Sequence, residues 1–247
     1  MRDARDVVLL HGWGITAGVW KDLAPRLAPR YRVRACDLPG YGASPACEPY
    51  TLHAVAEAVA RAAPARCRVV GWSLGGQVAL AWAQAHPQQV VRLALIAATP
   101  CFAQRASWPH AIPAEVLTGF SSALGADCAG TLRRFVSLQV QGDDLERNVA
   151  RQLRAALPAD GELGATALAG GLRILLETDL RGRLDAIRQP TLVLHGDRDR
   201  LAPLAAGEHL SRRLPAAWLA VVRGAAHAPF LTKPQEVAAA VDEFFDA

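Results

Sequence analysis

Residues 68–77 read Arg68-Val69-Val70-Gly71-Trp72-Ser73-Leu74-Gly75-Gly76-Gln77 and give the strongest indication of the fold. They join a short apolar run, typical of a buried strand, to a helical pattern that continues to His86. A Gly-x-Ser-x-Gly pattern between a strand and a helix is typical of a nucleophile elbow, a strained turn that exposes the serine hydroxyl. A chance match is expected only about 0.05 times in a chain of this length and composition. We therefore favour a nucleophilic Ser73 over a structural serine in a glycine-rich turn.

Short apolar segments alternate with helical patterns on both sides of this turn. Strands are predicted at residues 7–10, 31–36, 68–71, 92–97, 191–195 and 218–222. Helices are predicted at residues 16–28, 51–63, 73–86, 203–214 and 234–246. Short apolar strands separated by helices indicate an α/β fold, in which helices cover both faces of a mostly parallel sheet.

The middle of the chain, residues 103–183, shows helical patterns and no convincing strand. Helices are predicted at residues 112–124, 129–141 and 143–157, and we expect Asp143 and Asp144 to favour the start of the third one. We therefore predict an all-helical lid at residues 103–183, inserted into a core formed by residues 1–102 and 184–247. Because ligands of such sheets bind at the carboxyl ends of the strands, we expect the lid to cover the binding site.

The composition is that of a globular protein with a sizeable core. The 247 residues are 51% hydrophobic and 20% charged, and 27 Lys and Arg against 23 Asp and Glu give a net charge of +4. This small positive charge, without a basic tail, argues against binding to nucleic acid. It is compatible with binding to an acidic protein. No apolar run reaches the roughly 18 residues of a membrane span, and the first residues do not resemble a signal peptide. We expect a soluble, cytoplasmic monomer that does not bind membranes.

A serine hydroxyl becomes a good nucleophile only when a base takes its proton. The elbow architecture places the acid, and then the histidine, after the serine in the chain. His11, His53 and His86 come too early in the chain or next to the elbow helix, and His110 lies in the predicted lid. His195 lies inside a predicted strand, and His209 lies on a predicted surface helix. His227 remains as the candidate base, in the loop at residues 223–230 between the last strand and the last helix.

The candidate acid lies in the loop that follows the strand at residues 191–195. This loop, residues 196–203, contains two carboxylates, Asp197 and Asp199. Asp199 fits the Gly-x-x-Asp spacing, and we favour it as the group that holds the tautomer of His227. Asp197 is the alternative, although its place beside the strand indicates a residue that orders the turn.

Two backbone N–H groups are needed to bind the oxyanion that forms during acyl transfer. One is expected to come from Leu74, the residue after the nucleophile. The other is expected from Trp13, in the loop His11-Gly12-Trp13-Gly14 that follows the first strand. The indole of Trp13 would also form a wall of the acyl pocket, with core packing as the alternative.

Five short motifs are spread along the chain, and four of them contain the candidate site residues. A second group of sequence features lies around these motifs. The motifs are His11-Gly12-Trp13-Gly14, Asp37-Leu38-Pro39-Gly40-Tyr41-Gly42-x-Ser44, Gly71-Trp72-Ser73-Leu74-Gly75-Gly76, Gly196-x-x-Asp199 and Gly224-x-x-His227. The second group comprises Thr99-Pro100-Cys101-Phe102, Trp108-Pro109, Arg134-Phe135-Val136-Ser137-Leu138-Gln139, Gly170-Gly171-Leu172-x-Ile174-Leu175 and Ala225-Ala226-His227-Ala228-Pro229-Phe230. The motifs resemble the α/β-hydrolase family over nearly the whole chain. The second group is similar to a branch of that family that acts on a methyl ester in biotin synthesis.

The resemblance implies a serine esterase that removes a methyl group from a pimeloyl chain held on acyl carrier protein, without a metal or an organic cofactor. It implies arginine contacts between the lid and the acidic carrier protein, with a solvated helix face as the alternative. The implied docking residues are Arg134, Arg147 and Arg151. The implied substrate contacts are Trp13, Ser73, Leu74, Phe135, Val136, Ser137, Leu138, Gln139 and His227. For Phe135 and Leu138, ordinary lid packing is the alternative.

Two other functions fit the same motifs. A generic short-chain carboxylesterase or enol-lactonase could use the same fold and the same three side chains, because one fold hosts many activities. A hydrolase-like module that binds a ligand without catalysis belongs to a different class, against which an intact set of Ser73, Asp199 and His227 argues. Five cysteines without paired spacing argue against a disulfide framework or a zinc site.

Overall fold

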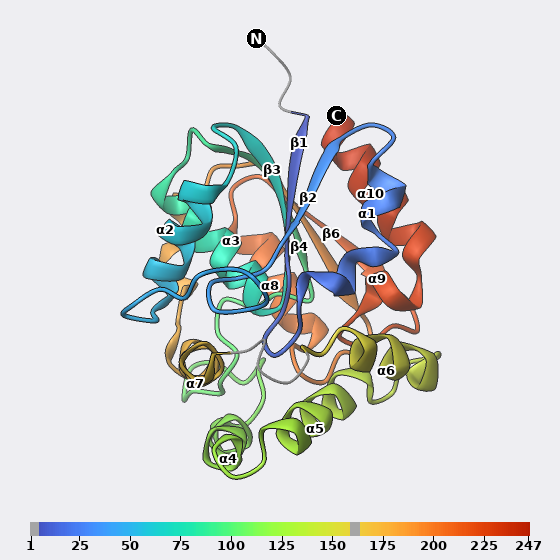
Figure 1. The fold of residues 1–247 in the computed structure, drawn as a ribbon. Helices are drawn as coiled ribbons and strands as arrows, with labels where there is room; N and C mark the ends of the chain where they lie inside the picture. The colour runs from blue at the N-terminus through green and yellow to red at the C-terminus, as the bar shows by residue number, and fades with distance from the viewer. Residues whose placement is uncertain (1–4, 159–163) are drawn as a thin grey trace.

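The computed structural model describes residues 5–158 and 164–247; residues 1–4 of the predicted core and 159–163 of the predicted lid lie outside the described residues. Six strands form one parallel sheet, in the order β2-β1-β3-β4-β5-β6 (Figure 1). Their bounds are Asp6–Leu10 (β1), Arg32–Cys36 (β2), Cys67–Trp72 (β3), Val90–Ile96 (β4), Thr191–Gly196 (β5) and Ala217–Val222 (β6). Each predicted strand is confirmed, with bounds that differ by at most two residues.

The burial of the strands explains their sequence pattern. The inner strands β1, β3 and β5 are buried along their whole length and are almost continuously apolar, whereas the edge strands β2 and β6 are largely accessible. Alternate side chains of a strand point to opposite faces of the sheet. In β1, Val8 and Leu10 therefore enter one hydrophobic cluster, and Val7 and Leu9 enter the other.

Helices cover both faces of the sheet, as the sequence predicts. Figure 1 shows α2 (Leu52–Ala62), α3 (Leu74–Ala85) and α8 (Leu204–Arg213) on one side, and α1 (Ala24–Leu27), α9 (Pro229–Thr232) and α10 (Pro234–Asp246) on the other. The single helix predicted at residues 16–28 is wrong. This segment forms the 3₁₀ helix η1 (Ala17–Lys21) and the short α1, because Pro25 starts a helix well but would break one that continued through it. No helix among the described residues has the length and apolar character to cross a bilayer.

The segment between β4 and β5 is helical and lies beyond the end of the sheet at which the parallel strands finish (Figure 1). We call it the helical insertion: α4 (Ala114–Leu124), α5 (Cys128–Val140), α6 (Glu146–Ala155) and α7 (Ala165–Glu177), followed by the 3₁₀ helix η2 (Arg181–Ala186). The sequence did not predict α7 as a helix, because Gly170 and Gly171 lower helix propensity. Their small size allows close packing, since a Cβ atom at Gly171 would lie 2.6 Å from the indole of Trp13.

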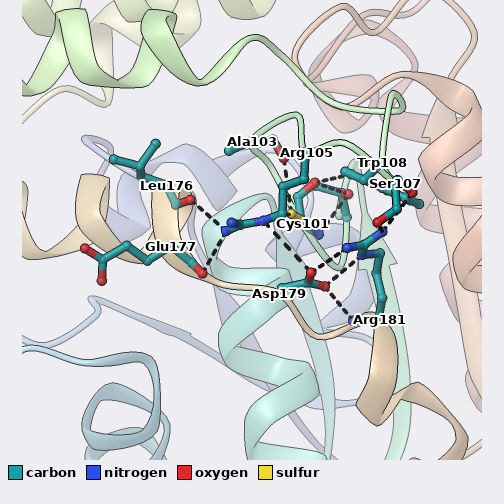
Figure 2. A network of polar contacts seen from close by, with 10 residues as sticks. Cys101, Ala103, Arg105, Ser107, Trp108, Leu176, Glu177, Asp179 and Arg181 are labelled. Carbon is teal, nitrogen blue, oxygen red and sulfur yellow. Dashed lines mark hydrogen bonds and ion pairs between the residues drawn. The ribbon is translucent and has the colours of Figure 1, made fainter.

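The two segments that connect the helical insertion to the core are tied to each other by arginines (Figure 2). Arg105, on the entering segment, donates hydrogen bonds of 3.1 and 2.9 Å to backbone carbonyls at the end of α7. Arg181, on the leaving segment, donates to the carbonyl of Ser107 at 3.0 Å and pairs with Asp179 at 2.7 Å. Its guanidinium also lies 5.4 Å from the ring centre of Trp108. These contacts tie the two ends of the insertion to each other.

Candidate active site

Ser73 occupies a sharp turn between β3 and α3. Its backbone has φ 56° and ψ −119°, a region that costs a non-glycine residue about 1–3 kcal/mol. The turn is held by the backbone N–H of Ser73, which donates to the carbonyl of Ile96 at 3.0 Å. Gly71 permits the turn, because a Cβ atom there would lie 2.5 Å from the carbonyl oxygen of Gly75. Gly75 itself leaves no room for a side chain beside the end of β1.

The expectation that this turn exposes the serine is wrong in one respect. Ser73 is only 2% exposed, because the helical insertion packs over the end of the sheet. Helix α7 lies against Trp13 and Leu74 through Gly171, and α5 contacts the same indole through Phe135, with ring centres 4.8 Å apart. The strained turn thus presents the hydroxyl to the space between sheet and insertion rather than to bulk water.

The structure brings Ser73, His227 and Asp199 into one hydrogen-bonded row. Nε2 of His227 lies 2.9 Å from the Ser73 hydroxyl, and Nδ1 of His227 lies 2.7 Å from Oδ2 of Asp199. All three side chains are buried. A proton on Nδ1, donated to the carboxylate, leaves Nε2 free to accept from the serine. This is the geometry of a nucleophile, its base and the acid that orients the base.

The two candidate carboxylates of residues 196–203, which we call the acid loop, have different partners in the structure. The second oxygen of Asp199, Oδ1, accepts hydrogen bonds from the backbone N–H groups of Leu201 and Ala202, each at 2.9 Å. Asp197 faces elsewhere, and its Oδ1 accepts from the N–H of Gly224 at 2.7 Å. Asp197 therefore links the two loops, and Asp199 is the carboxylate that reaches the imidazole.

The backbone N–H groups proposed for the oxyanion lie beside the serine. Leu74 is the first residue of α3, where a helix leaves its N–H groups unpaired. Within the described part of the chain, neither Leu74 N–H nor Trp13 N–H makes a hydrogen bond to the protein. The indole of Trp13 is engaged instead, since its Nε1 donates to the carbonyl of Leu168 at 2.8 Å. Trp13 therefore connects the loop after β1 to α7 and is buried between core and insertion.

His11 supports this loop, a role that the sequence analysis missed. Its Nδ1–H donates to the carbonyl of Gly12 at 2.8 Å, and its Nε2 accepts from the N–H of Leu38 at 2.9 Å. Burial lowers the pKa of the His11 imidazole to about 4, so it is neutral at physiological pH. The signal in the sequence was its position directly before Gly12 and Trp13.

Acidification is expected to destabilise the folded protein through His11. Its pKa is about 4 when folded against 6.5 for the free side chain, so between these values only the unfolded chain binds the proton. The contribution of neutral His11 to the free energy of unfolding is complete above pH 6.5 and is lost as the pH falls. The loss amounts to about 2 kcal/mol between about pH 6.5 and about pH 5. Urea denaturation at several pH values measures this loss.

The control for this prediction is His11→Asn, which removes the titrating group. Its unfolding free energy should fall less steeply with decreasing pH than that of the wild type. His195 has a pKa lowered by burial too, but it is present in both proteins and cancels in the comparison. Equal slopes for the two proteins would contradict the assignment to His11.

His195 lies behind the acid and does not reach the serine. Its Nε2–H donates to the carbonyl of Ala202 at 2.6 Å and lies 3.7 Å from Oδ2 of Asp199. Because burial lowers its pKa, it is a neutral imidazole that supports the acid loop. The sequence analysis excluded it as the base, and the structure places His227 in that position.

The residues of α5 expected to contact substrate differ in their placement. Phe135, Val136 and Gln139 are buried, and Leu138 is half-buried. The backbone carbonyl of Gln139 accepts from the N–H of His227 at 3.1 Å, which brings α5 to the candidate base. Ser137 is exposed and donates to the carbonyl of Arg133, so the structure does not bring it to Ser73.

The three arginines expected to meet a carrier protein lie on the outer face of the helical insertion. Arg134 on α5 and Arg147 and Arg151 on α6 are all exposed. Arg134 forms an ion pair of 3.7 Å with Asp127. Both side chains are 55% exposed, so this pair contributes little to stability. Arg151 donates to the side chain of Asn148 at 2.6 Å. Their charges remain available to a partner.

The expected start of α6 is wrong. The helix begins at Glu146 rather than at Asp143, and the side chain of Asp143 is turned toward the loop that carries His227. Its Oδ2 accepts from the N–H of Ala226 at 2.8 Å and from the hydroxyl of Thr232 at 2.7 Å. The acidic pair at residues 143–144 was visible in the sequence, but a partner so distant in the chain was not.

The sequence is similar to those of named proteins over nearly its whole length. The model of the alpha/beta hydrolase fold family matches residues 7–234. The pimeloyl-[acyl-carrier protein] methyl ester esterase of Aromatoleum aromaticum is 46% identical over 243 residues, which cover 96% of this chain and 97% of that protein. The protein of the same name from Nitrosomonas europaea is 39% identical over 237 residues, 96% of this chain and 94% of that protein.

A solved structure supports the same conclusion at the level of the fold. An esterase from Exiguobacterium antarcticum superposes with a TM-score of 0.86 at 22% identity, and the match covers 100% of this chain and 94% of that one. Together with the family match over residues 7–234, these similarities show that the chain belongs to the α/β-hydrolase family and is related within it to the pimeloyl-[acyl-carrier protein] methyl ester esterases.

Proposed function

We propose that the protein is a serine carboxylic ester hydrolase that removes the methyl group from pimeloyl-[acyl-carrier protein] methyl ester in biotin synthesis. The observation that carries the proposal is the hydrogen-bonded row of Ser73, His227 and Asp199 in a chain 46% identical to an esterase of that name. The reaction needs only groups of this chain and one water molecule.

The first step transfers the acyl group to the enzyme. The Oγ atom of Ser73 attacks the ester carbonyl carbon while Nε2 of His227 takes the hydroxyl proton. The oxygen of the tetrahedral intermediate becomes negative and accepts hydrogen bonds from the N–H groups of Trp13 and Leu74. The bond from carbon to the methoxy oxygen then breaks, and His227 gives its proton to the departing methanol.

The second step releases the free carboxylic acid. His227 takes a proton from a water molecule, whose oxygen attacks the acyl carbon bound to Ser73. The same N–H groups stabilise the second oxyanion, and His227 returns the proton to the serine oxygen as the ester bond breaks. Asp199 holds the imidazole in the required tautomer and stabilises its positive charge in both steps.

The acyl chain must reach Ser73 between the sheet and the helical insertion. Trp13 and Phe135 line this route, and Leu74, Val136, Leu138 and Gln139 complete the proposed contacts. Since Ser73 is 2% exposed, substrate entry requires side chains of the insertion to move. We place the protein in the cytoplasm as a monomer, where its substrate is carried by an acidic protein.

Charge reversal on the insertion is expected to weaken turnover of the carrier-bound substrate. In the variant Arg147→Glu/Arg151→Glu, an acidic carrier meets repulsion instead of attraction, so kcat/KM should fall about tenfold or more. Hydrolysis of a p-nitrophenyl ester should stay within about twofold, because no step at Ser73 uses these side chains. Steady-state kinetics on both substrates measures the difference.

A matched control is Arg61→Glu/Arg66→Glu. Arg61 lies in the last turn of α2 and Arg66 directly precedes β3, so both lie toward the amino end of the sheet, away from the helical insertion, and both are exposed. The control has the same change in net charge and should leave both activities unaltered. A loss equal on both substrates in Arg147→Glu/Arg151→Glu would count against docking at α6.

The test of the function is direct turnover of methyl pimeloyl-carrier protein compared with simple methyl and p-nitrophenyl esters. A clear preference for the carrier-bound ester, and growth of a biotin-requiring strain that lacks the esterase, would support the proposal. Equal or better turnover of simple esters would indicate a generic carboxylesterase. Failure of a fluorophosphonate to label Ser73 would indicate a binding module without catalysis.

A further inference from the structure

The carboxylate of Asp143 joins the helical insertion to the loop of the candidate base. It lies in the turn between α5 and α6 and is 7% exposed. Three donors share its two oxygens: Oδ1 accepts from the N–H of Leu145 at 2.8 Å, and Oδ2 accepts from the N–H of Ala226 and the hydroxyl of Thr232. A buried carboxylate with three donors is well satisfied, so this contact has a defined geometry.

The contact fixes the backbone on either side of the imidazole. Ala226 directly precedes His227, and its N–H is held by Asp143. The N–H of His227 itself is held by the carbonyl of Gln139, near the end of α5. Two successive N–H groups of the loop are therefore bound by the insertion, and Thr232 ties the end of α9 to the same oxygen. The core holds the same residue from its other side, since the indole of Trp72 donates to the carbonyl of His227 at 2.7 Å, so core and insertion together fix its backbone.

The same turn also contacts the loop of His227 and the loop of Asp199 at other points, where the side chains of Asp144 and Arg198 are exposed. The N–H of Asp144 donates to the carbonyl of Gly224 at 2.9 Å, and Arg198 donates to the carbonyl of Gly142 at 3.1 Å. The carboxylate of Asp144 pairs with Arg198 at 2.8 Å, but both side chains are 49% exposed. An exposed pair contributes little, so Asp143 is the main side-chain contact of this turn.

We propose that Asp143 is a positioning residue for His227, through which the helical insertion holds the general base in line with Ser73. This inference rests on the proposed esterase activity. A shift of about 1 Å in a reacting group can cost about 100-fold in rate. Loss of Asp143 should therefore lower kcat, while KM changes little because the side chain does not touch the acyl route.

An asparagine cannot replace Asp143 without loss. Its amide offers one oxygen and one NH₂ group, whereas both carboxylate oxygens of Asp143 face N–H donors. The NH₂ group would oppose either Leu145 N–H or Ala226 N–H, so one of the two contacts must break. Asp143→Asn is therefore expected to behave like Asp143→Ala rather than like the wild type.

The experiment compares Asp143→Ala, Thr232→Val, their combination and the control Asp144→Ala on a p-nitrophenyl ester, a substrate that does not involve the carrier protein. Asp143→Ala is expected to lower kcat about 10- to 100-fold with KM within about twofold. Thr232→Val should lower kcat less than Asp143→Ala does. The double variant should be no slower than Asp143→Ala, because both substitutions remove the same hydrogen bond between Thr232 and Asp143. Asp144→Ala should stay within about twofold.

Two further measurements separate positioning from loss of folded protein. Fluorophosphonate titration counts the molecules with a reactive Ser73, and kcat per labelled molecule should still be lowered in Asp143→Ala. The low-field proton resonance of His227 Nδ1–H should broaden or shift in this variant and stay unchanged in Asp144→Ala. Normal kcat per labelled molecule with an unchanged resonance would overturn the inference.

The design remains decisive in two unfavourable cases. If Asp143→Ala does not fold, Thr232→Val carries the test, and a normal kcat in that variant overturns the inference. If the wild-type protein hydrolyses no ester, the proposed function fails, whereas the proton resonance still reports whether Asp143 positions His227.

Discussion

The Ser73→Ala variant is expected to lose ester hydrolysis, with kcat lowered by about 10⁴- to 10⁶-fold. The change removes only the oxygen that forms the bond to the acyl carbon, so the two-step route through an acyl-enzyme is closed. Residual turnover would come from a water molecule activated by His227, with the oxyanion N–H groups still in place. The fold should persist, because alanine can take the same backbone conformation and, among residues 5–158 and 164–247, only His227 bonds to the hydroxyl.

Initial rates on a p-nitrophenyl ester and on the carrier-bound methyl ester measure this loss. Ser211→Ala is a matched control, because Ser211 lies on α8, away from Ser73, and its hydroxyl donates to the carbonyl of Glu208 on the same helix. This control should be as active as the wild type and should still react with a fluorophosphonate, whereas Ser73→Ala should not react. Turnover by Ser73→Ala within about tenfold of the wild type would remove Ser73 from the mechanism.

The features that could be predicted from the sequence are those encoded by neighbouring residues. The six strands were found because each is a short apolar run between helical patterns. The chain order of serine, acid and histidine, together with the predicted place of each histidine, narrowed seven histidines to His227, which the structure brings to Ser73. The choice of Asp199 over Asp197 rested on a spacing of three residues, and Asp199 is the carboxylate that lies against the imidazole.

The features that were missed depend on contacts between distant parts of the chain. Helix α7 escaped prediction because Gly170 and Gly171 are poor helix formers, and only packing against Tyr50 and Trp13 explains why they are glycines. The burial of Ser73 depends on how the helical insertion closes over the sheet. Local propensity contains no information on either contact.

Asp143 illustrates the same limit within the site. Two acidic residues before a helical pattern favour a helix start by capping, which is the local explanation. In the structure, Oδ1 of Asp143 accepts from the nearby Leu145 N–H, while Oδ2 binds Ala226 and Thr232, more than 80 positions away in the chain. The local pattern gives no sign of the long-range contact, which satisfies buried donors of another loop.

The Asp199→Asn variant is expected to lower kcat by about 10⁴-fold although it changes one atom. The amide oxygen must take the place of Oδ1, because Leu201 N–H and Ala202 N–H both donate there. The NH₂ group then faces Nδ1 of His227 and donates to it. The imidazole proton is forced onto Nε2, which can no longer accept the proton of Ser73.

Asp197→Asn is the matched control, with the same change of charge in the same loop. Its amide oxygen can still accept from the N–H of Gly224, and no part of it reaches the imidazole, so kcat should stay within about threefold. Steady-state rates and thermal unfolding of both variants distinguish loss of chemistry from loss of fold. The two substitutions remove the same charge at positions only two residues apart. A large difference in kcat between the two variants is therefore expected only if the tautomer of His227 depends on Asp199. A crippled Asp197→Asn beside an active Asp199→Asn would transfer the role of the acid to Asp197.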